Sequence, residues 1–190
     1  MKQQIILKIL AIILGVILLG ILIYFGFSKI KTQTSCPVQE EIRTVRGNSL
    51  EPLVSSGSKI KALFGYYNCH EIKRGDLVLY RYAGDKVPLL KIVKGIPSDS
   101  FHLVKNDQGE DNLIINGKIT VNSQNMPYAF NGNRYRMLSL YENDYKGVIP
   151  PNTYLLLGDQ ANGSVDASVF GLVDKSDIIG KAIVLKNKNY

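Results

Sequence analysis

Residues 76–93 read DLVLYRYAGDKVPLLKIV, two apolar runs on either side of a turn that contains Gly, Asp and Pro. Short apolar runs bounded by turn residues are typical of β-strands. Such runs recur along the chain: KIKALF at 59–64, FHLV at 101–104, NLIING at 112–117, YLLLGD at 154–159 and KAIVL at 181–185. Helix-length amphipathic stretches are scarce by comparison. The pattern predicts a mainly β domain of the barrel or sandwich kind.

Two further stretches refine this prediction. The Asn116-Gly117 pair, followed by Lys118, predicts a tight hairpin turn between the apolar triplets LII and ITV. The stretch SQNMPYAFNGNRYRMLSLYENDY at 123–145 is polar and aromatic and follows neither strand nor helix periodicity. We therefore expect an excursion from the sheet there.

The N-terminal stretch is uncharged from Ile9 to Phe27 and reads ILAIILGVILLGILIYFGF. As a helix it would span about 28 Å, the thickness of the hydrocarbon core of a bilayer. A cleaved signal peptide is the alternative, but its apolar region is usually only about 7–15 residues long and ends at a small-residue cleavage site. The SKIKTQT that follows Phe27 offers no such site. We favour a retained anchor.

These features divide the chain into three parts. Residues 1–31 are expected to form the membrane anchor, with its helix at about 9–27. Residues 32–44 are polar and are expected to be a juxtamembrane linker that leads into a first strand. Residues 45–190 are expected to form the folded domain. Lysines flank the apolar stretch on both sides, so charge alone leaves the orientation open.

The net charge of +7 does not indicate nucleic-acid binding. Residues 1–31 contain four lysines and no acidic residue, and subtracting these four leaves +3 for the remainder. No basic run is present in that remainder, so the excess fits membrane flanks better than a nucleic-acid surface.

Cysteines and histidines are sparse. Cys36 and Cys69 are too few for a tetrahedral metal site, and His70 and His102 stand apart without ligand spacing. No metal is expected. A Cys36–Cys69 bridge in an oxidising compartment and two separate thiols both remain open.

Four segments, taken in order, resemble the motifs of the type I signal peptidases, the Ser-Lys endopeptidases that remove signal sequences from secreted proteins. They are GNSLEPL at 47–53, RGDLVLY at 74–80, KIVKGIPSD at 91–99 and GDQANGSVDASVFGLV at 158–173. The resemblance covers most of the chain after the apolar stretch. It implies a fold of one transmembrane helix followed by a coiled antiparallel β-sheet, barrel-like peptidase domain.

The resemblance assigns Ser49 as the nucleophile and Lys91 as the general base. Counting back from Gly95 selects Lys91, and strand alternation sends Lys94 to the other face. A lysine base must be neutral, so its pKa must fall from about 10.4 to about 7 or 8, a difference of roughly 4 kcal/mol. Desolvation by the apolar residues around Lys91 is expected to supply this shift.

The fourth segment carries supporting residues and departures from the family pattern. The resemblance implies that Ser164 hydrogen-bonds and orients the lysine, that Asp166 pairs with an arginine, and that Asp159 keeps its family place. Ser168 stands where that arginine belongs. In the first segment, Gly47 occupies the place of a second oxyanion-hole donor but has no side chain to donate. Other departures are Ile92, Gln160, Ala161, Gly163 and Ala167.

The resemblance implies hydrolysis of preproteins that carry small residues at the first and third positions before the cut, without metal or organic cofactor. Leu50 and Pro52 are candidate substrate-binding residues. The expected location is the cytoplasmic membrane, in contact with lipid, with a single span and the catalytic domain outside the cytoplasm. A specialised processing peptidase of the pilin or conjugation type is one alternative. A degenerate membrane-tethered peptide-binding module, motivated by the missing arginines, is the other.

Overall fold

The computed structural model describes residues 3, 13–21, 36–83, 87–161 and 163–185. The chain divides into two compact units, Met1–Ser35 and Cys36–Tyr190. In the first unit, residues 13–21 are helical. The remainder of the anchor helix expected over 9–27 lies outside the described residues. Within the described ranges, no helix combines the length and the apolar character needed to cross a membrane.

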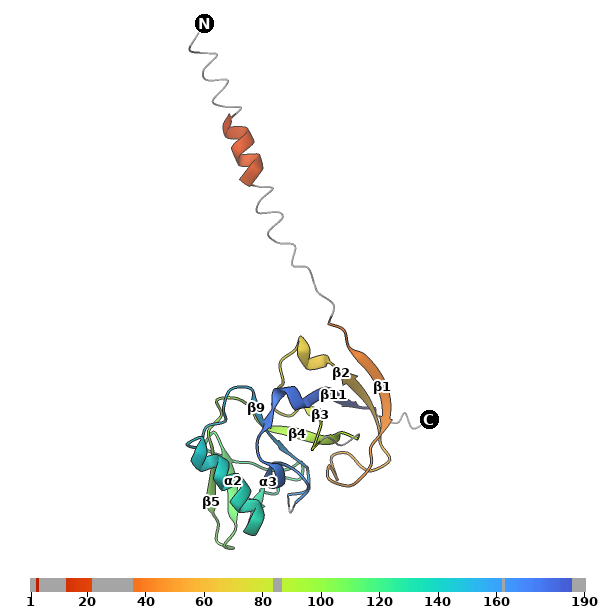
Figure 1. Cartoon of the computed structure of the whole chain (residues 1–190), viewed down its shortest axis with the longest axis vertical. Coiled ribbons are helices and arrows are strands. Elements are labelled where there is room, and N and C mark those ends of the chain that lie inside the picture. The colour runs from red at the N-terminus through yellow and green to blue at the C-terminus, as the bar shows by residue number, and fades with distance from the viewer. Residues whose placement is uncertain (1–2, 4–12, 22–35, 84–86, 162, 186–190) are drawn as a thin grey trace. The chain divides into compact units, whose positions relative to one another are not determined.

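The second unit is built on a seven-stranded sheet (Figure 1). Its strands, in spatial order, are β1 (Gln39–Thr44), β2 (Lys59–Phe64), β11 (Ile178–Val184), β3 (Leu77–Tyr80), β4 (Leu89–Gly95), β9 (Thr153–Leu157) and β10 (Val173–Asp174). Every neighbouring pair is antiparallel. The prediction of a mainly β domain is confirmed, and the runs at 59–64, 76–82, 154–159 and 181–185 each supply a strand.

A second, four-stranded sheet contains β5 (Phe101–Lys105), β6 (Asp111–Ile115), β7 (Lys118–Ile119) and β8 (Ala129–Phe130). Ile115 pairs with Lys118 across the turn between β6 and β7. Asn116 and Gly117 both have positive φ, 50° and 73°, as a two-residue hairpin turn of type I′ requires. The predicted hairpin is confirmed.

The expected barrel-like closure is not formed. Among the described residues, β1 and β10 are the two edges of the larger sheet. Closure needs edge strands that pair along their length. β10 has only two residues and runs directly into the 3₁₀ turn η2 (Lys175–Asp177), so it cannot serve as such an edge.

Two sequence boundaries also need correction. The linker expected over 32–44 contains β1, which pairs with β2. This strand is mostly exposed and its sequence, QEEIRT, is charged, so the sequence shows no apolar run of the kind that marks the other strands. The excursion expected over 123–145 contains β8 and a helix, α2 (Gly132–Asp144). Leu138 is the buried residue of α2, so the sequence shows no apolar stripe of helical period. α2 packs against the short helix α3 (Ala167–Phe170) and against β5.

The core of this unit forms three apolar clusters. The first lies between the smaller sheet, α2 and β9, and includes Phe101, Leu113 and Leu155. The other two draw on successive residues of β4: Val93 belongs to one and Ile92 to the other. Because successive side chains of a strand point to opposite faces, β4 is buried on both sides. The middle of the larger sheet is therefore shielded from solvent on both faces.

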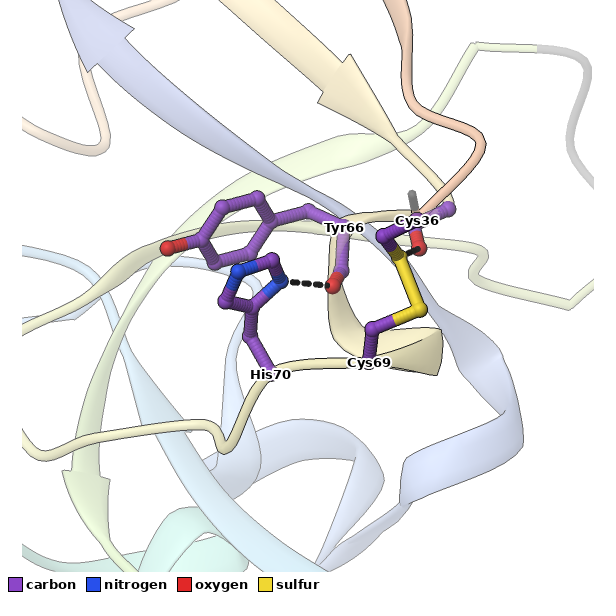
Figure 2. Close-up of a disulfide and its surroundings, with 5 residues drawn as sticks. Cys36, Tyr66, Cys69 and His70 are labelled. Carbon is purple, nitrogen blue, oxygen red and sulfur yellow. Dashed lines mark hydrogen bonds between the residues drawn. A yellow bond between two sulfur atoms is a disulfide. The ribbon is translucent and has the colours of Figure 1, made fainter. Parts of the chain in front are cut away.

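Cys36 and Cys69 form a disulfide, with their Cα atoms 5.8 Å apart (Figure 2). The bond joins the start of the folded unit to the residue after the 3₁₀ turn η1 (Tyr66–Asn68). The ring of His70 stacks on Tyr66 at a centroid distance of 4.0 Å, and its Nδ1 lies 2.9 Å from the Tyr66 carbonyl oxygen. The question that the sequence left open is answered in favour of the bridge.

Replacing both cysteines with serine is expected to lower the free energy of unfolding by roughly 2–4 kcal/mol, because the bridge restricts the unfolded chain over a separation of 33 residues. Urea unfolding of the full chain in detergent measures the difference. Reductant should lower the free energy of unfolding of the wild type by the same amount and leave that of the double-serine variant unchanged. Equal stability of the two proteins without reductant would show that the thiols are not joined.

Candidate active site

Ser49 lies in the turn that follows β1. Gly47, two residues earlier, has a φ of +84°, a conformation that glycine adopts without strain. Leu50 is buried, with 2% of its surface exposed, and packs in a core cluster. The Val54 N–H donates to the Leu50 carbonyl at 2.8 Å. Leu50 thus fixes the turn to the core, while Ser49 stays half-buried at its surface.

The end of β9 holds the Ser49 turn from the other side. The Asp159 N–H donates to the Ser49 carbonyl oxygen at 2.7 Å. Gly158 lies so close that a Cβ there would overlap both the Ser49 carbonyl oxygen and Ser164 Oγ. Asp159 itself is buried and accepts hydrogen bonds from the Leu53 N–H at 3.3 Å and the Ser123 N–H at 2.9 Å. Its carboxylate therefore joins three separate segments.

Lys91 reaches Ser49 from β4. Its side chain is 2% exposed, and Nζ lies 3.0 Å from Ser49 Oγ. Burial lowers the pKa of Lys91 below its ordinary value, and the nearby Asp166 carboxylate opposes this shift. Lys94 points elsewhere: its Nζ donates to the Val121 carbonyl at 2.8 Å. The structure thus brings Lys91, and not Lys94, to Ser49.

Asp166 is a buried carboxylate with 1% exposure. It accepts hydrogen bonds from Ser164 Oγ at 2.6 Å, from Ser168 Oγ at 2.7 Å, from the Ser168 N–H at 3.1 Å and from the Gly158 N–H at 3.2 Å. The resemblance implied a bond from Ser164 to the lysine. In the described part of the chain, Ser164 Oγ instead donates to Asp166. Ser168 supplies two of the four donors, in place of the arginine that the resemblance led us to expect.

Two residues near the site were not predicted from the sequence, and both come from the polar stretch at 123–145. Tyr128 is buried, and its hydroxyl donates to the Gly158 carbonyl at 2.6 Å. Arg134 donates to the Ser164 carbonyl at 3.0 Å and to Ser168 Oγ at 3.3 Å. The aromatic and basic side chains of this stretch could have suggested contacts with the site, but these residues belong to none of the four motifs.

A cavity of about 560 Å³ opens beside Ser49 and Lys91. Its walls come from the end of β1 and the start of β4, and include Arg46, Gly47, Leu50, Val87 and Leu90. The candidate residue Leu50 lines the cavity. Pro52 is exposed and is not one of the lining residues.

Two backbone N–H groups of the turn, those of Gly47 and Ser49, have no partner among the described residues. Backbone N–H groups in such a turn can stabilise a developing negative charge. In the same described ranges, no cluster of three or more His, Cys, Asp or Glu side chains could hold a metal ion.

Comparisons with known proteins agree on one family. The family described as "Signal peptidase, peptidase S26" matches residues 4–185. Signal peptidase IB of Staphylococcus aureus strain COL is 27% identical over 149 residues, which cover 73% of each chain. The inactive signal peptidase IA of the same strain is 26% identical over 141 residues, which cover 72% of each chain.

Among solved structures, the crystal structure of a signal peptidase I from Enterococcus faecalis V583 aligns with a TM-score of 0.37 and 18% identity. The alignment covers 62% of this chain and 98% of that chain.

Substituting Asp166→Asn is expected to lower the pKa of Lys91 further, because it removes the negative charge that opposes the effect of burial. An NMR titration of lysine-labelled protein follows Lys91 directly, with its signal assigned by loss in Lys91→Met. Asp174→Asn, an exposed acid-to-amide change, is the control and should leave the midpoint in place. A midpoint that rises or stays fixed in Asp166→Asn would contradict the electrostatic coupling.

Proposed function

Because the chain belongs to the signal peptidase family, peptidase S26, we propose that it is a membrane-bound serine endopeptidase that removes signal peptides from secreted preproteins. The observation that carries this proposal is the buried Lys91 amine 3.0 Å from the Ser49 hydroxyl, at the wall of an open cavity. A nucleophile and a base within hydrogen-bonding reach form the minimal unit of covalent peptide hydrolysis.

In the proposed reaction, neutral Lys91 accepts the Ser49 proton while Oγ bonds to the scissile carbonyl carbon. The carbon–nitrogen bond then breaks, and Lys91 returns the proton to the leaving amine. This leaves an ester between Ser49 and the signal peptide. A water molecule, deprotonated by Lys91, attacks the ester, releases the signal peptide as a carboxylic acid and restores the Ser49 hydroxyl. Burial favours this route because it lowers the pKa of Lys91 and so favours the neutral form of the amine.

The negative charge on the attacked carbonyl oxygen needs donors. We assign this role to the backbone N–H groups of Ser49 and Gly47, which have no internal partners among the described residues. A side-chain donor at position 47 is absent because the residue is glycine. A single such donor is worth about 3 kcal/mol when lost.

The peptide before the cut is proposed to lie in the cavity between the end of β1 and the start of β4. Leu50 and Leu90 form part of its apolar wall. A restricted apolar wall favours small side chains at the positions next to the cut, because larger ones are excluded sterically. Pro52 lies outside this cavity, so we assign it no contact with the peptide.

Two features support the proposed compartment. The apolar stretch at 9–27 is proposed as a retained membrane anchor. The preproteins proposed as substrates of the peptidase emerge on the outer face of the cytoplasmic membrane. The Cys36–Cys69 disulfide is compatible with an oxidising exterior and is unusual in a reducing cytoplasm. We therefore place the folded unit outside the cytoplasm.

A catalytically silent peptide-binding module is the second candidate, because one relative of this chain is named an inactive signal peptidase. The intact contact between Lys91 and Ser49 favours the peptidase. Turnover of a preprotein separates the two candidates.

Purified full-length protein in detergent is expected to cleave a preprotein at its signal-peptide junction. Ser49→Ala and Lys91→Met should each lower kcat/KM by at least about 1,000-fold, because each removes one half of the reacting pair. Lys94→Met is the matched lysine control and should keep activity within about tenfold of wild type. A silent wild type with intact preprotein binding would select the binding module.

A reporter fused after Tyr190 should be active outside the cytoplasm if the folded unit is extracytoplasmic. An alkaline phosphatase fusion, which needs oxidised cysteines, and a cytoplasm-active β-galactosidase fusion give opposite readouts. Strong β-galactosidase activity with a silent phosphatase fusion would reverse the proposed orientation.

A further inference from the structure

One side chain of α2 reaches the loop that carries Ser164, Asp166 and Ser168. The helix lies beside α3, which begins directly after Asp166 (Figure 1). Arg134, on the first turn of α2, donates from Nη2 to the Ser164 carbonyl at 3.0 Å and from Nη1 to Ser168 Oγ at 3.3 Å. Its planar guanidinium thus spans both ends of the short loop. A planar fork with fixed donors suits such a two-point contact.

The loop leaves room for this contact. A Cβ on Gly163 would overlap the nitrogens and the central carbon of the Arg134 guanidinium. Any larger residue at 163 would push the guanidinium away from the Ser164 carbonyl. Gly163 and Arg134 therefore fit together as a matched pair.

The contact continues inward to the reacting residues. Ser168 Oγ accepts from Arg134 and donates to Asp166 Oδ1 at 2.7 Å. Asp166 accepts from Ser164 Oγ, and its charge acts on Lys91. The four direct donors to Asp166 are all neutral groups, and Arg134 is the cation that bonds to one of them among the described residues.

We propose that Arg134 is a positioning residue for the Ser49–Lys91 pair, acting through the Ser164–Ser168 loop. This inference rests on the proposed peptidase activity and names a residue that supports it from outside the reacting pair. Removing the guanidinium loosens the loop and the carboxylate beside Lys91, without touching the cavity that receives the peptide.

Two other charged residues of α2 bond elsewhere. Arg136 bonds to Asn133 of its own helix, and Glu142 bonds to the ring of His102 on β5 at 3.2 Å. Arg136 therefore provides a matched control: it is an exposed arginine on the same helix, and its hydrogen bond goes to Asn133 and not to the loop.

Arg134→Ala is expected to lower kcat for preprotein cleavage by roughly 10- to 100-fold and to leave KM within about twofold, because the reacting groups are misplaced while the peptide site is intact. Arg136→Ala should leave both constants near wild type. Methylguanidinium added at millimolar concentration should restore part of kcat in Arg134→Ala by occupying the vacated space, and methylammonium should not. If Arg134→Ala does not fold, Arg134→Gln is read in the same way.

A second readout does not depend on turnover. Arg134 bonds to Ser168, which bonds to Asp166, and a positive charge on this side disfavours the protonated amine. Loss of the guanidinium should therefore raise the pKa of Lys91 in the lysine-labelled NMR titration, whereas Arg136→Ala should not move it. If the wild type cleaves nothing, the proposed function fails and this titration alone decides the role of Arg134. An unchanged Lys91 midpoint would overturn the inference. An effect on kcat equal to that of Arg136→Ala would overturn it as well.

Discussion

The burial of the Lys91 amine is the constraint on which the rest of the site depends. An amine that loses almost all contact with water is tolerable mainly in its neutral form, and it needs a hydrogen-bond partner there. The fold meets both needs by placing Lys91 on β4, an interior strand between β3 and β9, and by bringing Ser49 Oγ within 3.0 Å. The chemistry of the pair is thus set by the location of one strand within the sheet.

That location creates a second requirement, because Ser49 lies 42 residues before Lys91 and in a turn rather than in a strand. Leu50 fixes the turn to a core cluster, and the backbone of Gly158 and Asp159 contacts the Ser49 carbonyl oxygen. Asp159 also holds the segment around Ser123, so movement in any one of these three segments is resisted by the other two. Such cross-linking keeps the Ser49 hydroxyl in place although Ser49 lies outside regular secondary structure.

Much of this arrangement could be predicted from the sequence. Apolar runs between turn residues gave the strands, and Asn116-Gly117 gave the hairpin, because both signals are local. The resemblance to the type I signal peptidases implied that Ser49 and Lys91 act as a pair. The contacts of α2 could not be predicted, because the helix buries little of its surface and so shows no period. Arg134 and Tyr128 act across the fold, and nothing in their own neighbourhood in the sequence marks their partners.

The disulfide has a mechanical consequence for a protein proposed to be tethered by its N-terminus. β1 is an edge strand, and the hydrogen bonds of such a strand can be opened one after another by tension applied at its end. Cys36 precedes β1 and is bonded covalently to Cys69, so a force on the preceding chain divides between β1 and the segment around η1. β1, whose last residues border the cavity, therefore carries only part of the force and is less easily separated from the sheet.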